Sequence, residues 1–373
     1  MKILGIETSC DETAAAVISA ETPRRGVSNQ RRGVSGQGKK IKILSNIISS
    51  QIDIHKKYGG VVPEVAAREH VLNIIPVINE ALTVAGLPAE ALAKEGEVDL
   101  DAIAVTVGPG LITSLLVGVE TAKTLSYAWK VPVIAVNHIE GHIYANFVGR
   151  QQATDNRQQK IKFPAIILTV SGGHTMLILM EDHGKYRTIS QTRDDAAGEA
   201  FDKAAKLMEL GYPGGPAIAA EAEKFKILNL KSKITLPRPM INSPNFDFSF
   251  SGLKTALRYD LEKNPNYKSQ ITNYSYEFQQ AVIDVLIKKT AKAAKKYNTK
   301  SIMLTGGVAA NKELRSQMAR EIKKNFPDTT FLVPDLKYTT DNAVMIAVAG
   351  YYKAKRKEFT PWEKIKTDPN LRL

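Results

Sequence analysis

Two histidines four residues apart, His138 and His142, are the residues of this sequence best suited to chemistry. They follow an apolar run at 131–136, which predicts a strand leading into a helix whose first turn carries both imidazoles. Residues four apart share one face of a helix, so both rings can bind one cation. The pair by itself fits a metal site and a pair of packed, hydrogen-bonded rings equally well.

The spacing is similar to that of zinc proteases, but the glutamate is displaced. In the protease helix the general base directly follows the first histidine. Here Ile139 follows it, and Glu140 is rotated by about another 100° around the helix axis. The pattern favours a metal site with a chemistry other than peptide hydrolysis, and a metalloprotease remains the rival.

Asp341 is the candidate for a third ligand. It stands at the start of a very apolar helix of small side chains, which must be packed inside. An N-cap explains one polar residue at such a position, but it does not explain the acid. Two histidines and one carboxylate suit iron or zinc and leave positions open for water or substrate.

Three Gly-Gly pairs, at 172–173, 214–215 and 306–307, predict turns that could together hold a nucleotide. Glycine lets backbone N–H groups approach phosphate closely, and a following helix adds its positive end. Each pair alone marks only a turn. The sequence has neither a Walker motif nor the Gly-x-Gly-x-x-Gly fingerprint, which argues against P-loop and Rossmann folds. Glu199 and Asp202 share a helix face, but a solvated helix start is their simpler interpretation.

The order of the predicted elements indicates an internal duplication. A strand at 2–7, a polar turn and a strand at 14–19 recur as a strand at 165–170, a turn and a strand at 176–180. Helices are predicted at 112–129, 277–296 and 311–325, and they alternate with predicted strands, such as the one at 301–305. This alternation indicates the α/β fold class. We assign residues 1–150 and 163–373 to two lobes joined by a link at 150–162, with the terminal helix region returning toward the first lobe.

Composition narrows the class of protein. Cys10 is the only cysteine, so no intramolecular disulfide can form. No apolar run has membrane-spanning length and the first residues lack a signal peptide, so we expect a cytoplasmic protein with no membrane partner.

The net charge of +13 indicates a polyanionic partner. Residues 21–42 hold seven basic residues and one acid, and the segment 21–40 is a basic insertion. This segment is interpreted either as a solvated surface loop or as a flexible arm that binds nucleic acid, and its composition alone favours the loop.

Several long motifs together resemble the bacterial tRNA N6-adenosine threonylcarbamoyltransferase family, formerly labelled glycoproteases. They run in family order over nearly the whole chain and include GIETSCDET (5–13), GGVVPE (59–64), NHIEGH (137–142), VSGGH (170–174), DDAAGEAFDK (194–203), YPGGP (212–216), FSFSGLKTA (248–256), TGGVAAN (305–311) and TDNAVMIA (340–347).

This resemblance implies a two-lobed fold of the actin, Hsp70 and sugar-kinase type. It implies that His138, His142 and Asp341 hold one divalent metal ion, Fe²⁺ by preference with Zn²⁺ as the alternative. The family positions for threonylcarbamoyl-AMP correspond to Thr169, Val170, Ser171, Gly172, Gly173, Asp202, Gly215 and Asn311. For Asp202 the resemblance overrides the simpler interpretation given above.

The resemblance also implies a reaction and its partners. The family transfers threonylcarbamoyl to N6 of the adenine beside the anticodon in tRNAs that read codons beginning with A, forming t6A. No protein nucleophile is required, and Glu12 is the candidate proton acceptor. Expected partners are tRNA, a homologous noncatalytic protein (TsaB-type) and a small ATPase (TsaE-type). A noncatalytic scaffold and a phosphotransferring ATPase of the same fold are the further rivals.

Overall fold

The computed structural model describes residues 1–20, 41–87, 98–148, 161–229 and 234–373. The basic insertion at 21–40 and most of the link at 150–162 lie outside these residues. The chain forms two compact units. Unit 1 comprises Met1–Gln51, Pro63–Gln158 and Asp341–Arg372, and unit 2 comprises Ile52–Val62, Gln159–Thr340 and Leu373. The assignment of lobes to 1–150 and 163–373 stays a prediction.

Unit 1 is built on a five-stranded mixed sheet with the order β3-β2-β1-β4-β5. β1, β2 and β3 are antiparallel neighbours, and β4 and β5 continue the sheet in parallel with β1. The strands are β1 (Lys2–Glu7), β2 (Glu12–Ala20), β3 (Ile41–Ser50), β4 (Ala102–Gly108) and β5 (Val133–Asn137). The helices are α2 (Pro63–Val84), α3 (Ile112–Trp129), α4 (His138–Tyr144) and α10 (Ala343–Lys355), with short 3₁₀ turns at Ala145–Phe147 and Trp362–Lys364.

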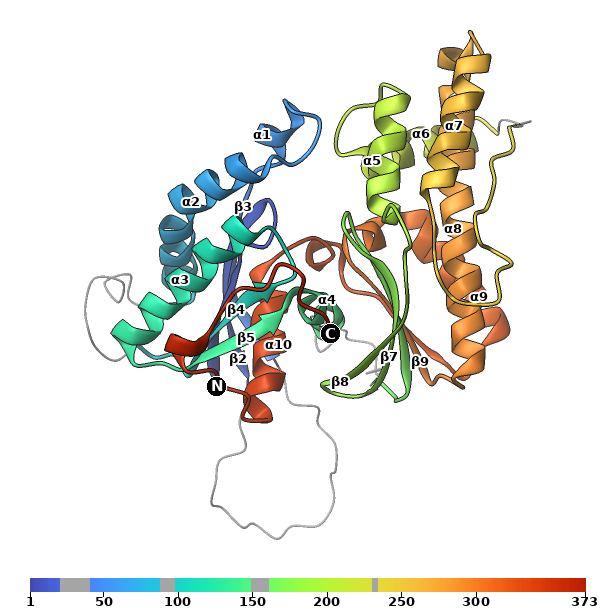
Figure 1. The fold of residues 1–373 in the computed structure, drawn as a ribbon. Helices are drawn as coiled ribbons and strands as arrows, with labels where there is room; N and C mark the ends of the chain where they lie inside the picture. Colours follow the sequence, from blue (N-terminus) through green and yellow to red (C-terminus); the bar gives the residue numbers. More distant parts are fainter. Residues whose placement is uncertain (21–40, 88–97, 149–160, 230–233) are drawn as a thin grey trace. The chain divides into compact units, whose positions relative to one another are not determined.

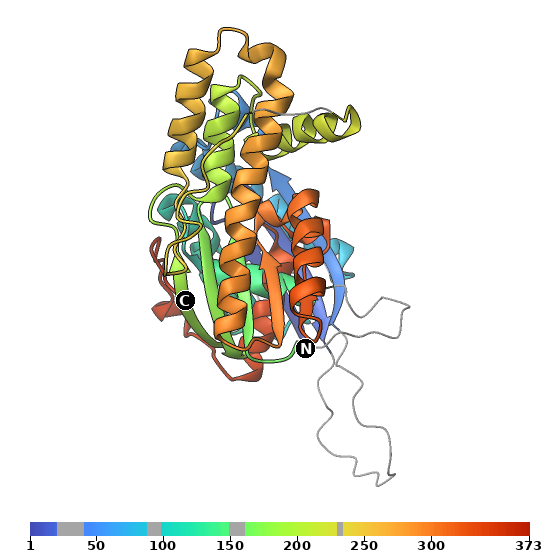
Figure 2. The ribbon, with the colours of Figure 1, turned by 90° about the vertical axis from the view of Figure 1, so that its right-hand side faces the viewer.

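Unit 2 is built on a second five-stranded sheet with the order β10-β9-β6-β7-β8. Its strands are β6 (Ala165–Val170), β7 (Thr175–Asp182), β8 (Lys185–Gln191), β9 (Ser301–Thr305) and β10 (Thr330–Leu332). Its helices are α1 (Ile52–Lys56), α5 (Ala197–Leu207), α6 (Gly214–Ile227), α7 (Ser251–Lys263), α8 (Ile271–Lys296) and α9 (Lys312–Asn325). It also has 3₁₀ turns at Tyr267–Gln270, Gly307–Ala310 and Leu336–Tyr338. In Figure 2, α8 is the long orange helix that runs along this sheet.

The two sheets repeat one plan, which confirms the predicted duplication. In unit 2, β6 pairs antiparallel with β7, β7 with β8, and β9 and β10 continue in parallel, just as β4 and β5 follow β1 in unit 1. Each sheet therefore consists of three antiparallel strands that follow one another in the chain, and two further strands lie parallel beside the first of them. The α/β class expected from the sequence is confirmed.

Packing on β1 brings the start of α10 close to the sheet of unit 1. Leu4 and Ile6 belong to one apolar core with residues of α2 and α3, the two helices labelled beside this sheet in Figure 1. Gly5 points to the opposite face, because side chains alternate along a strand. A Cβ on Gly5 would lie 2.3 Å from the carbonyl oxygen of Ala343. Only glycine permits this approach, and α10 begins directly after Asp341 and Asn342.

The predicted strands at 2–7, 165–170 and 301–305 and the predicted helix at 112–129 match the structure. Several boundaries were wrong, and among them β7 spans Thr175–Asp182 rather than 176–180. β2 begins at Glu12 rather than at residue 14, α8 begins at Ile271 rather than at 277, and Asn311 caps α9 instead of belonging to it. Among the described helices, none combines the length and the apolar character that crossing a membrane requires.

Candidate functional site

The two histidines lie on a helix whose start is fixed by a cap. Asn137 ends β5, and its side-chain oxygen accepts hydrogen bonds from the backbone N–H of Ile139 (2.8 Å) and of Glu140 (3.3 Å). α4 therefore begins at His138 and places His142 one turn later on the same face. The two ring centroids are 4.6 Å apart, and both side chains are buried.

Asp341 joins this pair from almost the other end of the chain. Its Oδ1 lies 3.2 Å from Nε2 of His142 and 3.6 Å from Nε2 of His138. The cap of α10 is the neighbouring Asn342, whose side chain accepts from the N–H of Met345 at 3.1 Å. Because Asn342 does the capping, Asp341 is left to face the imidazoles, as the sequence predicted.

The separations of the three side chains suit one divalent cation. Their ligand atoms all lie within 4.8 Å of one another. Bonds of about 2.1 Å to a tetrahedral ion place neighbouring ligand atoms roughly 3.4 Å apart, which agrees with the 3.2 and 3.6 Å measured here. The triad within unit 1 can hold a metal ion.

A fourth residue, Glu7, supports the triad and was missed in the sequence. It ends β1, is fully buried, and accepts hydrogen bonds from the N–H of Ser9 (2.6 Å) and the hydroxyl of Thr106 (2.7 Å). Its Oε2 also lies 3.2 Å from Nδ1 of His138. A carboxylate at Nδ1 orients the ring so that Nε2 can face a metal. The signal available in the sequence was an acid that ends a strand whose residues after Lys2 are apolar.

Glu7 and His138 shift each other's pKa in opposite directions. Burial opposes charge on His138, but Asp341 and Glu7 outweigh it and raise the pKa of its imidazole to about 9. Burial likewise tends to raise the pKa of Glu7, yet His138 brings it below the usual value. Without a bound cation His138 is therefore protonated at neutral pH, and a metal ion must displace that proton.

Glu140, the displaced glutamate, pairs with cations of α10. Its buried carboxylate lies 3.7 Å from Nζ of Lys353 and 3.6 Å from the guanidinium of Arg356. These ion pairs connect α4 to the helix that follows Asp341. The position of Glu140 supports a structural role and gives no support to the general base of a protease.

Glu12, the candidate proton acceptor, lies at the first position of β2 in unit 1. Its carboxylate accepts a hydrogen bond from the hydroxyl of Ser50 at 3.3 Å. Burial, together with the neighbouring charges of Asp11 and Asp341, raises the pKa of Glu12 well above its ordinary value. A raised pKa moves a carboxylate toward the range in which general bases work.

Unit 2 contains a cavity of about 530 Å³, a size typical of sites for small molecules. Four of the predicted substrate residues line it, namely Gly172, Asp202, Gly215 and Asn311. Of the other four, Thr169 and Val170 are buried in β6, and Ser171 and Gly173 belong to the turn after it. The predicted contacts of those four residues stay a prediction.

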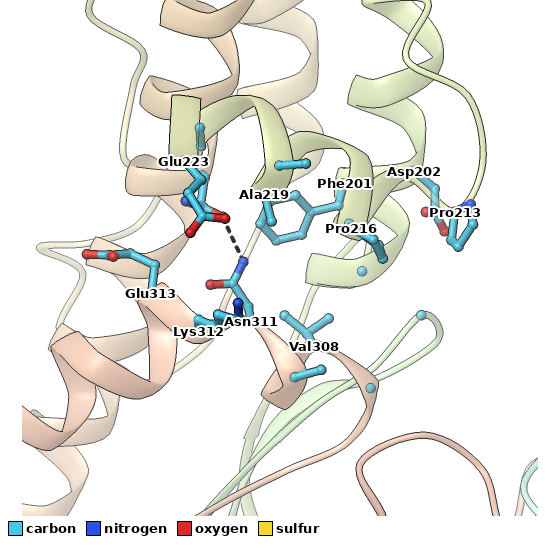
Figure 3. Close-up of a pocket in the computed structure, with 18 of the residues that line it drawn as sticks. Phe201, Asp202, Pro213, Pro216, Ala219, Glu223, Val308, Asn311, Lys312 and Glu313 are labelled. Atoms are coloured by element: carbon cyan, nitrogen blue, oxygen red, sulfur yellow. Dashed lines mark hydrogen bonds between the residues drawn. The ribbon is translucent and has the colours of Figure 1, made fainter. Parts of the chain in front are cut away.

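Asp202 and Asn311 each hold a helix start at the cavity. Oδ1 of Asp202 accepts from the N–H of Gly214 at 2.7 Å, which ties α5 to the first residue of α6. Asn311 caps α9 through the N–H of Leu314 (3.0 Å) and donates to Gln279 of α8 (2.7 Å), the bond dashed in Figure 3. The fit of Asp202 to α6 replaces the interpretation of a merely solvated helix start.

Glu199, the other acid on that helix, has a different environment. It forms an ion pair with Lys203 at 2.9 Å, and Lys203 also pairs with Asp195 at 2.6 Å. Glu199 and Asp202, whose spacing places them on one helix face, therefore have different roles. The solvated interpretation holds for Glu199.

The cavity combines an apolar wall with several helix N-termini. Its apolar side chains include Phe201, Pro216 and Val308, and Asp202 and Glu313 lie toward opposite ends of it (Figure 3). Gly198 near the start of α5, Gly215 at the start of α6 and Lys312 at the start of α9 also line it. Apolar walls suit a planar ring and helix N-termini suit phosphate, so the cavity fits a nucleotide.

The chain matches known proteins over most of its length. The family model described as tRNA N6-adenosine threonylcarbamoyltransferase matches residues 42–348. The enzyme of that name from Syntrophomonas wolfei is 46% identical over 360 residues, covering 96% of this chain and 94% of the relative. The one from Bacillus subtilis is 46% identical over 352 residues (94% and 90%), and the one from Thermosipho africanus is 43% identical over 373 residues (100% of both).

Among solved structures, a crystal structure of full-length HypF in the phosphate- and nucleotide-bound form has a similar fold. The TM-score is 0.56 at 12% sequence identity, and the alignment covers 97% of this chain and 56% of that chain. At this identity the likeness speaks only for the fold, and it agrees with the predicted fold of the actin, Hsp70 and sugar-kinase type.

Metal affinity should increase with pH. Because the pKa of His138 is raised to about 9, a proton competes with the cation at every pH below that value. The affinity for Zn²⁺ should therefore rise by roughly tenfold per pH unit between about pH 6.5 and 8.5 and level off above about pH 9. A titration against a chelator of known pH dependence measures this, and an affinity that is constant over the range would contradict it.

Glu7→Gln should weaken metal binding without removing a ligand. The amide keeps the size of the side chain but loses the charge that orients His138, so the affinity for Zn²⁺ should fall by about 10–100-fold. Glu120→Gln, at an exposed acid of α3, is the matched control and should leave the affinity unchanged. An affinity for Glu7→Gln within twofold of the natural protein, with unchanged circular dichroism, would refute the orienting role.

Proposed function

The chain belongs to the tRNA N6-adenosine threonylcarbamoyltransferase family, and on that premise we propose the donor and the acceptor of its reaction. The donor is threonylcarbamoyl-AMP. The acceptor is N6 of the adenine beside the anticodon in tRNAs that read codons beginning with A. The class of activity, a transferase that forms t6A on tRNA, is that of the family as a whole.

The observation that carries the proposal is the triad of His138, His142 and Asp341. Ligands about two hundred positions apart in the sequence come within bonding reach of one ion, and buried Glu7 orients one of them. When bound, a divalent cation would act as a Lewis acid toward the threonylcarbamoyl carbonyl, carboxylate or hydroxyl. Fe²⁺ is our preferred ion because two histidines and one carboxylate form its usual set, and Zn²⁺ is the alternative.

The nucleotide-sized cavity of unit 2 is the proposed site for the adenylate part of the donor. Phe201, Pro216 and Val308 would contact the adenine ring, and the N-terminal turns of α5, α6 and α9 would face its phosphate. Asp202, Gly215 and Asn311 are proposed to contact the ligand, together with the turn that runs from Thr169 to Gly173.

The transfer needs no protein nucleophile. N6 of the adenine attacks the carbamoyl carbon and forms the new C–N bond, while the bond from that carbon to the phosphate oxygen breaks and AMP departs. The proton released by N6 must go to an acceptor, and Glu12 is the proposed one. The remaining contribution of the protein is to position the reactants and stabilise developing charge.

The proposal includes partners of the reaction. By resemblance to the family, this chain acts with three other proteins. They are a homologous noncatalytic protein (TsaB-type), a small ATPase (TsaE-type) and a separate enzyme that makes the adenylate. The metalloprotease alternative has no support from the site, because Glu140 pairs with Lys353 and Arg356.

Replacing a metal ligand should abolish transfer. The natural protein, supplied with partners, metal and threonylcarbamoyl-AMP, should form t6A that mass spectrometry of tRNA nucleosides detects. Asp341→Asn and His142→Ala should reduce product formation by at least about a hundredfold, because Lewis-acid stabilisation amounts to several kcal/mol. Asp99→Asn, at an exposed acid of unit 1, is the control. Full activity of a ligand variant that binds no metal would overturn the mechanism.

A further inference from the structure

The second half of α8 and the residues after it carry an unusual excess of positive charge. Residues 287–300 contain six lysines and no acid. Three of the lysines, Lys288, Lys292 and Lys296, are exposed and follow one another at intervals of four, so they form a single stripe along the helix. We call these three residues the lysine stripe. Like charges at this spacing destabilise a helix.

Aromatic rings hold part of the stripe in place. Nζ of Lys292 lies 5.6 Å and Nζ of Lys296 lies 5.4 Å from the ring centre of Phe246. Lys296 also lies 5.8 Å from the ring of Tyr297, over which Arg187 of β8 lies at 5.4 Å. Three cations therefore gather on two neighbouring rings. Such contacts are weak at exposed sites and neutralise no charge.

The hydrogen-bond partners of the stripe are neutral. Nζ of Lys288 donates to the amide oxygen of Asn242 at 2.8 Å. Nζ of Lys292 donates to the carbonyl oxygens of Ser243 (2.9 Å) and Pro244 (2.6 Å). The loop at 242–245 thus orients the ammonium groups and leaves their charge uncompensated.

Several other lysines of unit 2 differ in this respect. Lys203, Lys224 and Lys268 each form an ion pair with a carboxylate. Within the part of the chain that the structure describes, no salt bridge involves a residue of the lysine stripe or Arg187. Asp284 lies one helical turn before Lys288, but its carboxylate pairs with Arg238, so the three lysines keep their positive charge.

We infer that the lysine stripe and Arg187 bind the sugar-phosphate backbone of the tRNA substrate, an inference that rests on the proposed function. Successive lysines rise by about 6 Å along α8, which presents a row of point charges to a chain of phosphates. Phe246 is buried and both rings are covered by cations, so the surface contacts phosphate and not bases. Contacts of this kind fix the position of the RNA and carry no sequence information.

The same helix also reaches the nucleotide cavity. Gln279 of α8 lines the cavity and accepts the hydrogen bond from Asn311. Lys288 and Lys296 follow it by about 14 and 26 Å along the helix axis. A single rigid element would therefore fix the distance between a bound tRNA backbone and the proposed adenylate site of unit 2.

The test compares two triple variants by their affinity for tRNA at several salt concentrations. The first is Lys288→Gln, Lys292→Gln and Lys296→Gln. The second, Lys130→Gln, Lys364→Gln and Lys366→Gln, removes the same charge from exposed positions of unit 1. The stripe variant should lower the slope of log affinity against log salt by about 2–3 and weaken binding by at least roughly tenfold at low salt. The control variant should change the slope by less than one.

The outcomes separate this inference from the proposed function. The stripe variant should raise KM for tRNA and leave kcat nearly unchanged, because it alters no residue at either proposed site. An unchanged salt slope, or an equal change in the control variant, would overturn the stripe as a tRNA surface whatever the transferase assay shows. A natural protein that binds tRNA through the stripe but forms no t6A would overturn the proposed function alone.

Discussion

Two carboxylates converge on the imidazole of His138, and the rest of the site depends on the positive charge between them. Glu7 approaches Nδ1 at 3.2 Å, and Asp341 approaches Nε2 at 3.6 Å. Both acids lie in surroundings that exclude most water, where unbalanced charge is costly. A proton on His138 can supply the balance, and so can a divalent cation bound at Nε2. Because a cation bound there would also contact His142, the metal site is suited to exchanging a proton for a metal ion.

The scaffold of unit 1 maintains this convergence through contacts that surround the ligands. Gly5 lets α10 approach β1 closely, which sets the position of Asp341 just before that helix. Glu140 joins α4 to α10 through Lys353 and Arg356. The cap at Asn137 fixes where α4 begins. Each contact holds an element that supplies a ligand, so ligand geometry and packing are set together.

Residue types and their spacing in the sequence predicted the three ligands, whereas contacts between residues distant in the sequence were not predicted. The spacing of His138 and His142 and the unexplained acid Asp341 pointed to one site, and the structure brings them together. Glu7 was missed although it ends an apolar strand, because its donor Thr106 is distant in sequence and spacing does not show burial.

Element boundaries show the same limit. The strands at 2–7, 165–170 and 301–305 were predicted to the residue, whereas the start of α8 was placed six positions late, because its first turns are polar and show no amphipathic pattern. Spacing placed Glu199 and Asp202 on one face, but only the fold shows that one meets Lys203 and the other meets Gly214. The lysines at the end of α8 can be read from the sequence, but their neutral hydrogen-bond partners come from a loop over forty positions earlier.

Anomalous scattering from crystals of the metal-loaded protein tests the central claim most directly. With data collected at the absorption edge of the metal, the account predicts one strong peak at bonding distance, about 2.0–2.2 Å, from Nε2 of both histidines and from the carboxylate of Asp341. A peak elsewhere in the chain, or one that contacts the imidazoles but not Asp341, would contradict it.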